Sequence, residues 1–238
     1  MSALAISPLV AQIREYRSRI YEQGYAEGRN GRRTSLWPVA VQQPAGEFLR
    51  DLVIREGAKT TFETGLGLGL STLFIVEGLL TRNPAGNISH TAVEPHPEGF
   101  DFAGERIVIE SGAVALTTII TADSTVALPQ LLARNHRFDF AYIDGGHLFE
   151  FAFIDIFNAL RLVRAGGLIV VDDHWMASVQ TALGFFHANR SLQFELYDPA
   201  GPGKRFVGLR VPNELDSRHW DHFVEFSRAT LPEYPWRQ

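Results

Sequence analysis

Apolar and polar residues are arranged at helical spacing at the start of the chain. From Ser7 to about Glu27 the apolar residues recur every three or four positions, which predicts an amphipathic helix. The polar, glycine-broken stretch Gly28–Arg33 predicts a connection. Pro44–Glu56 predicts a second helix, because proline is well tolerated in a first turn.

Further along, five short β-rich runs alternate with helical stretches. The runs are Thr60–Glu63, His90–Glu94, Thr117–Thr121, Phe138–Ile143 and Leu168–Asp172. The helical stretches between them are Ser71–Leu80, the segment around Phe102–Ser111, Thr125–Asn135 and Phe149–Val163. This alternation predicts a parallel sheet with right-handed crossovers.

The pattern changes after the fifth run. A predicted helix, Ala177–Asn189, precedes two runs, Gln193–Tyr197 and Phe206–Val211, and the turn-rich residues between the runs indicate an antiparallel hairpin. The sequence therefore predicts an α/β fold whose seven-stranded sheet has five parallel strands and a C-terminal antiparallel hairpin, flanked by helices. Ligands of such sheets bind beyond the carboxyl ends of the strands.

Composition narrows the class of protein. Hydrophobic residues make up 45% and charged residues 21% of 238 residues, as in a soluble globular protein with one α/β domain, or with one domain and a small appendage. The net charge of −5 argues against nucleic acid and anionic membranes as partners. The chain has no cysteine, no apolar run of about 20 residues and no recognisable export signal. We therefore expect a cytoplasmic protein. A homo-oligomer is compatible with this composition.

A glycine-rich loop follows the first strand. Glu63 precedes Gly65, Gly67 and Gly69, and a helix opens near Ser71. Nicotinamide and flavin folds use similar loops, so the glycines alone do not identify a ligand. A carboxylate at Glu63 would repel a pyrophosphate, whereas it would accept a hydrogen bond from the α-ammonium group of S-adenosylmethionine. The alternative is a buried strand-end glutamate that the backbone satisfies.

Two further strand ends carry polar residues. Glu94 ends the second strand, where an acid can accept both ribose hydroxyls, although a turn residue before Pro95 is the alternative. Asp123 and Ser124 follow the third strand. They either cap the next helix or bind the adenine amine, and both roles are compatible.

These motifs resemble a known family. The loop E-T-G-L-G-L-G-L-S-T, Glu94 and the A-D-S step are similar to the cofactor motifs of class I S-adenosylmethionine-dependent methyltransferases. The stretches F-D-F-A-Y-I-D-G-G-H and L-V-R-A-G-G-L-I-V-V-D-D-H resemble metal-dependent O-methyltransferases related to catechol O-methyltransferase and to the macrocin and mycinamicin sugar O-methyltransferases. The resemblance covers roughly Gln42 to Val211.

The resemblance implies a Rossmann-like methyltransferase fold. Apart from the resemblance, we expect residues 41–238 to form the S-adenosylmethionine-binding domain and residues 1–40 to form an N-terminal helical segment. This segment is either an acceptor lid or a helix that packs on the domain. The residues that would bind the cofactor are Glu63, Gly65, Gly67 and Ser71 at the methionine end, Glu94 at the ribose, Asp123 and Ser124 at the adenine, and Asp144 beside them.

Three aspartates point to a metal. Asp144 ends the fourth strand, and Asp172 and Asp173 end the fifth, so their carboxylates can converge. Mg²⁺ would relieve the repulsion between them, and they match the metal-binding positions of the resembled family. The alternatives are that Asp173 caps a helix and that Asp144 only lines the cofactor site.

His147 stands three residues after Asp144, so both side chains can reach one cleft. The resembled sugar methyltransferases carry D-x-x-H here with the histidine as general base, and imidazole titrates near neutral pH. A helix-start histidine bonded to backbone is the alternative. We thus expect a Mg²⁺-assisted O-methyltransferase with His147 and Asp144 as catalytic residues and a hydroxyl of a small molecule (a sugar, a natural product or a catechol-like ring) as acceptor. A metal-independent methyltransferase, a dinucleotide-binding oxidoreductase and a binding-only protein remain alternatives.

Overall fold

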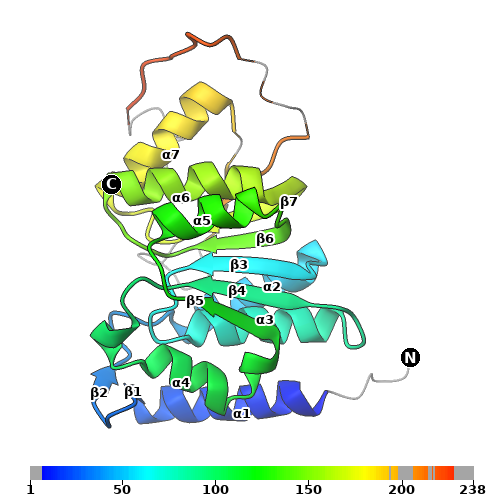
Figure 1. The fold of residues 1–238 in the computed structure, drawn as a ribbon, viewed down its shortest axis with the longest axis vertical. Coiled ribbons are helices and arrows are strands. Elements are labelled where there is room, and N and C mark those ends of the chain that lie inside the picture. Colours follow the sequence, from blue (N-terminus) through cyan, green and yellow to red (C-terminus); the bar gives the residue numbers. More distant parts are fainter. Residues whose placement is uncertain (1–6, 193, 198–205, 214–215, 217, 228–238) are drawn as a thin grey trace. The chain divides into compact units, whose positions relative to one another are not determined.

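The computed structural model describes residues 7–192, 194–197, 206–213, 216 and 218–227. The chain divides into two compact units, Met1–Asp123 and Ser124–Gln238 (Figure 1). Within the described residues, no helix is long and apolar enough to cross a membrane.

The first unit contains a parallel sheet with the strand order β5, β4, β3. Its strands are β3 (Thr60–Thr64), β4 (Ser89–Val93) and β5 (Thr117–Ile120). A separate antiparallel hairpin pairs β1 (Tyr25–Glu27) with β2 (Arg33–Ser35). The central strand, β4, is hydrogen-bonded on both sides, and the glycine-rich loop follows directly from β3.

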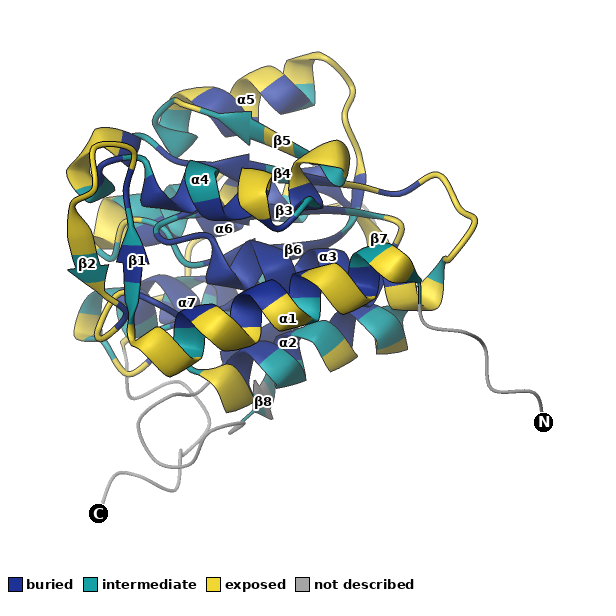
Figure 2. Cartoon of the chain, turned by 90° about the horizontal axis from the view of Figure 1, so that it is seen from below, coloured by how far each residue is buried: buried dark blue, intermediate teal, exposed yellow. Residues whose placement is uncertain are grey.

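Helices surround this sheet. They are α1 (Pro8–Gln23), α2 (Gln43–Glu56), α3 (Leu70–Arg82) and α4 (Ala103–Glu110), with the short 3₁₀ helices η1 (Pro97–Phe100) and η2 (Ala113–Leu116). α3 is buried at every position from Leu70 to Leu80, whereas exposed and buried residues alternate along α1 (Figure 2). Both α1 and α2 pack on α3, which explains why α3 is buried on all sides.

A buried glutamate links these three helices. Glu77 of α3 is fully buried and forms ion pairs with Arg14 (2.7 Å) and Arg17 (2.6 Å) of α1 and with Arg50 (3.4 Å) of α2. The Arg17 guanidinium also lies 3.8 Å from the centre of the Phe74 ring. A carboxylate without partners would be costly in this interior, so the arginines fix α1 and α2 onto α3.

The second unit contains the strand order β6, β7, β9, β8. Its elements are β6 (Phe138–Ile143), β7 (Val163–Val171), β8 (Phe194–Tyr197) and β9 (Phe206–Arg210), with helices α5 (Ser124–Ala133), α6 (Phe149–Leu162) and α7 (Ala177–Arg190). β6 and β7 are parallel, and β9 is antiparallel to both β7 and β8. The core of this unit is formed by large rings such as Tyr142, Phe140, Phe186 and Phe206.

These seven strands, with parallel pairing in each unit and a terminal antiparallel hairpin, confirm the predicted fold class. The predicted end of the first helix at Glu27 is wrong. Gly24 adopts a left-handed conformation (φ 75°) that ends α1, and Tyr25–Glu27 instead pairs with β2. The proposed division at residues 40 and 41 stays a prediction.

Candidate active site

The glycine-rich loop of the first unit connects β3 to α3. Gly65, Gly67 and Gly69 have φ values of 87°, 51° and 75°, in the left-handed region that favours glycine. A side chain at Gly69 would also approach the carbonyl oxygen of Gly104 in α4 to 2.9 Å. The loop therefore requires glycine both for its backbone conformation and for the close approach of α4.

Glu94, the residue after β4, is joined to this loop. Its Oε2 accepts a hydrogen bond from the Gly67 amide (2.9 Å), and its Oε1 accepts one from the His96 amide (3.0 Å). The side chain is almost fully buried, so these two amides fix its orientation. Each carboxylate oxygen still has a lone pair that can accept a hydroxyl, as the predicted ribose contact requires.

Glu63 is fully buried at the end of β3. Its Oε1 accepts a hydrogen bond from the hydroxyl of Thr72 and lies 3.2 Å from Nε2 of His90. Its Oε2 has no hydrogen-bond partner among the described residues, and the same holds for the buried hydroxyl of Thr64. Buried polar atoms are rarely left unpaired, so both atoms fit a ligand that donates hydrogen bonds or carries positive charge.

Three other predicted cofactor residues, Ser71, Asp123 and Ser124, lie at helix starts. Ser71 is buried in the first turn of α3. Asp123 is the last residue of the first unit and Ser124 the first residue of α5, and both are half-buried. Their positions are compatible with helix capping and with ligand contact alike.

An acidic cluster lies in the second unit. Asp144 follows β6, and Asp173 lies two residues after the end of β7. Nε2 of His147 lies 2.9 Å from Oδ2 of Asp173 and 3.6 Å from Oδ1 of Asp144. One ligand atom from each of the three residues lies within 4.8 Å of the others. The cluster thus brings together two carboxylates and one imidazole, a set that suits a divalent cation.

Asp172 has different surroundings from Asp173. Its carboxylate is buried and accepts hydrogen bonds from the Tyr142 hydroxyl (2.5 Å) and the Asp173 amide (2.7 Å). Burial, and then the negative charges of Asp144 and Asp173, raise the pKa of Asp172. The structure therefore joins Asp144, Asp173 and His147 in one cluster and turns Asp172 towards Tyr142; its role as a metal ligand stays a prediction.

The carboxylates also control the charge of His147. Pairing with Asp144 and with Asp173 raises the pKa of His147 to about 10, so without a cation the imidazole is protonated at neutral pH. Two contacts orient the cluster: Nε1 of Trp175 donates to Asp173 (2.8 Å), and the Ser178 hydroxyl donates to the carbonyl oxygen of His147 (2.5 Å).

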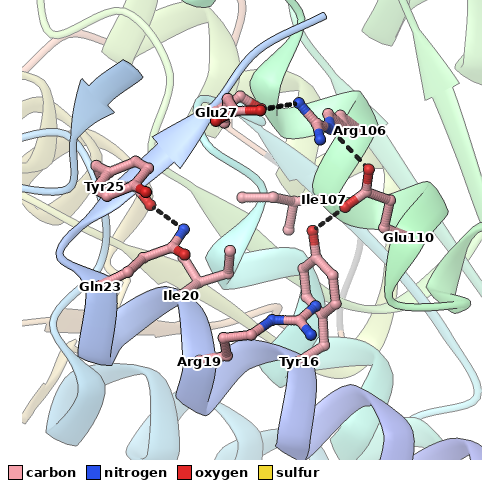
Figure 3. Close-up of a pocket in the computed structure, with 9 residues that line it drawn as sticks. All are labelled: Tyr16, Arg19, Ile20, Gln23, Tyr25, Glu27, Arg106, Ile107 and Glu110. Atoms are coloured by element: carbon pink, nitrogen blue, oxygen red, sulfur yellow. Dashed lines mark hydrogen bonds and ion pairs between the residues drawn. The ribbon is translucent and has the colours of Figure 1, made fainter. Parts of the chain in front are cut away.

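A separate cavity of about 130 Å³ lies in the first unit between α1, β1 and α4 (Figure 3). Three of its four charged side chains, those of Glu27, Arg106 and Glu110, pair with one another. Arg106 donates to Glu110 (2.7 Å) and to Glu27 (3.0 Å), and the Tyr16 hydroxyl donates to Glu110 (2.6 Å). None of the predicted site residues lines this cavity, and its internal ion pairs explain its polar lining.

Sequence reasoning missed several residues at these sites. Thr72 and His90 contact Glu63, Tyr142 contacts Asp172, and Trp175 contacts Asp173. A signal existed for Tyr142 and His90, because each is a polar residue in a predicted strand that is otherwise buried on both faces. Thr72 had no comparable signal.

Comparisons with known proteins concern the fold of the chain. Residues 62–174 match the family model described as a methyltransferase domain. No curated protein sequence matches the chain. The O-methyltransferase TomG from Streptomyces achromogenes, in complex with S-adenosylmethionine, shares 19% identity over 87% of this chain and 91% of its own, with a TM-score of 0.63.

A second solved structure has the same fold. The O-methyltransferase from Bacillus cereus, in complex with S-adenosylhomocysteine, shares 17% identity over 86% of this chain and 91% of its own, with a TM-score of 0.60. At such low identity these likenesses establish the fold alone. The chain therefore has the fold of these two O-methyltransferases, and its residues 62–174 resemble a methyltransferase domain.

Proposed function

We propose that this chain transfers the methyl group of S-adenosylmethionine to a hydroxyl oxygen of a small molecule. The observation that carries the proposal is the unpartnered Oε2 of the fully buried Glu63, at the start of a loop that only glycines can form. The methyltransferase domain, and the O-methyltransferases that share its fold, support the reaction class.

Cofactor binding is assigned to the residues around this loop. Glu63 would accept from the α-ammonium group, with Thr64, Gly65, Gly67 and Ser71 around the methionine end. Glu94, held by two backbone amides, would accept the ribose hydroxyls, because each of its oxygens keeps one lone pair for a further donor. Asp123 and Ser124 would bind the adenine, and Asp144 stays a predicted cofactor residue. S-adenosylmethionine itself supplies a methyl group on a positively charged sulfur.

Asp144 and Asp173 would hold Mg²⁺, with Asp172 contributing from its buried position. Their oxygen atoms are hard ligands, and the convergence of Asp144, Asp173 and His147 supports a cation there. Bound Mg²⁺ lowers the pKa of a hydroxyl and favours acceptors with two neighbouring oxygens. A sugar, a natural product or a catechol-like ring meets that requirement.

His147 would be the general base. Its Nε2 would take the proton of the acceptor hydroxyl once the imidazole is neutral. A cation on the carboxylates of Asp144 and Asp173 opposes the charge that keeps His147 protonated, so metal binding and base function are coupled.

The test is isothermal titration calorimetry followed by a turnover assay. We expect S-adenosylhomocysteine to bind and NAD not to bind, and we expect methyl transfer to polyol or catechol acceptors in Mg²⁺. Tight NAD binding with no heat from S-adenosylhomocysteine would instead favour an oxidoreductase. Cofactor binding without turnover on any acceptor would favour a binding-only protein. In this proposal residues 41–238 would form the S-adenosylmethionine-binding methyltransferase domain, and residues 1–40 would form an N-terminal helical segment that could serve as a lid.

A further inference from the structure

Four buried side chains form a hydrogen-bonded chain beneath the glycine-rich loop. Thr61 and Glu63 lie two positions apart on β3, so they point to the same face, and the parallel register places Thr61 opposite His90 of β4. Thr72 approaches Glu63 from the first turns of α3. None of the four side chains is exposed to solvent, so bulk water cannot act as a hydrogen-bond partner for them.

One arrangement of protons satisfies the whole chain. A carboxylate only accepts, so Nε2 of His90 (3.2 Å from Oε1 of Glu63) must carry a proton and donate it. If the ring is neutral, Nδ1 then accepts from the Thr61 hydroxyl at 2.8 Å. A doubly protonated ring would donate to Thr61 instead, and the Thr61 hydroxyl would have no acceptor among its contacts in the described part of the chain.

The result is an asymmetric carboxylate. Oε1 of Glu63 receives two donors, from Thr72 and His90, whereas Oε2 receives none from the residues that the structure describes. Two donors on one oxygen fix the orientation of the carboxylate plane. The other oxygen keeps its lone pairs for a ligand in a water-free interior, where a charged hydrogen bond is strongest.

We propose that His90 is a positioning residue for the cofactor: as a neutral Nε2–H tautomer it holds Glu63 so that Oε2 meets the α-ammonium group of the bound amino-acid moiety. This inference rests on the proposed role of Glu63. Outer contacts that orient a ligand-binding group commonly affect affinity, because the group would otherwise have to be ordered when the ligand binds.

Two variants that both remove the ring test the proposal. In His90→Gln the amide nitrogen can occupy the place of Nε2, whereas in His90→Asn it reaches only the place of Nδ1. We expect His90→Gln to bind S-adenosylhomocysteine within about threefold of the wild type and His90→Asn to bind about tenfold more weakly, as expected for a lost hydrogen bond to a charged group. In a Glu63→Gln background, His90→Asn should cause no further loss.

Each outcome separates the inference from the proposed function. If Glu63→Gln weakens binding but His90→Asn does not, or if the two losses add, the positioning role is wrong and the role of Glu63 stands. If Glu63→Gln itself leaves the affinity for S-adenosylhomocysteine unchanged, the positioning role of His90 and the proposed role of Glu63 are both wrong. Should the variants fail to fold, the ¹⁵N spectrum of the wild-type His90 ring decides: a protonated Nε2 with an unprotonated Nδ1 supports the proposal, and a doubly protonated ring overturns it.

Discussion

The amide nitrogen of Gly67 lies 2.9 Å from Oε2 of Glu94, so the glycine-rich loop after β3 is hydrogen-bonded to the acid that follows β4. The carboxylate proposed to accept the ribose hydroxyls therefore also holds the loop proposed to bind the methionine end. A change at Glu94 should thus affect the contacts at both ends of the cofactor.

Glu94→Ala should weaken S-adenosylhomocysteine binding by about 1.5–3 kcal/mol or more, because it removes a charged acceptor and frees the Gly67 amide. Glu94→Gln keeps one carbonyl acceptor, so this variant should lose less affinity for S-adenosylhomocysteine than Glu94→Ala. Calorimetry of both variants checks this order. An unchanged affinity in Glu94→Ala would remove Glu94 from the binding site.

Glu63→Gln should weaken S-adenosylhomocysteine binding by about 1.5–3 kcal/mol, the loss expected when a charged hydrogen bond is removed. Methylthioadenosine lacks the ammonium group and serves as a matched control, since its affinity should hardly change. If both ligands lose affinity equally, the variant has disturbed the loop and the assignment of Oε2 to the ammonium group is contradicted.

Removal of the metal should abolish methyl transfer. Asp144→Asn and Asp173→Asn should each raise the Mg²⁺ concentration needed for half-maximal activity, because a neutral amide is a weaker ligand than a carboxylate. S-adenosylhomocysteine affinity should stay near that of the wild type in Asp173→Asn. Initial rates measured over a Mg²⁺ series test this, and full turnover in excess chelator would refute the metal requirement.

His147→Ala should lower kcat by about 10²–10⁴-fold, the usual contribution of a placed general base. Cofactor affinity should change little. Raising the pH should partly restore the variant, since hydroxide can replace the base. A decrease of less than about tenfold in kcat would contradict the base role.

His147 should also make stability depend on pH when no cation is bound. Its pKa is raised from 6.5 to about 10 in the folded chain, so the stability that it contributes is fully present below pH 6.5 and is lost as the pH rises towards 10. In excess chelator, the Tm of the wild type should fall more between pH 7 and pH 10 than the Tm of His147→Ala. If the Tm values of the two proteins change in parallel with pH, the pairing of His147 with its carboxylates contributes nothing to stability.

The sequence predicted the main elements well where the hydrophobic pattern was unambiguous. Phe138–Ile143 corresponds to β6 residue for residue, because a short apolar run between polar segments is typical of a strand buried on both faces. The hairpin of β1 and β2 was missed. Its strands are three residues long, and its turn is held by Asp101, which accepts from the Asn30 amide (2.8 Å) and lies far away in the sequence.

For the candidate site, the sequence predicted positions at strand ends but not the contacts of each side chain. The ends of the predicted strands led us to propose Glu63, Glu94 and Asp144, since parallel strands present their carboxyl ends at one edge; their roles stay predictions. The sequence could not distinguish Asp172 from Asp173. Neighbouring side chains at a strand end point in different directions, and only the fold reveals that Tyr142 binds the first while His147 and Trp175 bind the second.

The three arginines around Glu77 limit how the protein can be shortened. A truncated chain that begins at residue 41 would lack Arg14 and Arg17 and keep Arg50, at 3.4 Å, as the remaining arginine against a fully buried carboxylate. Removing partners from a buried ion pair typically costs about 3–5 kcal/mol, a large part of the stability of an ordinary domain. A minimal enzyme for expression should therefore keep the first helix, or replace Glu77 together with its partners by apolar residues of similar size.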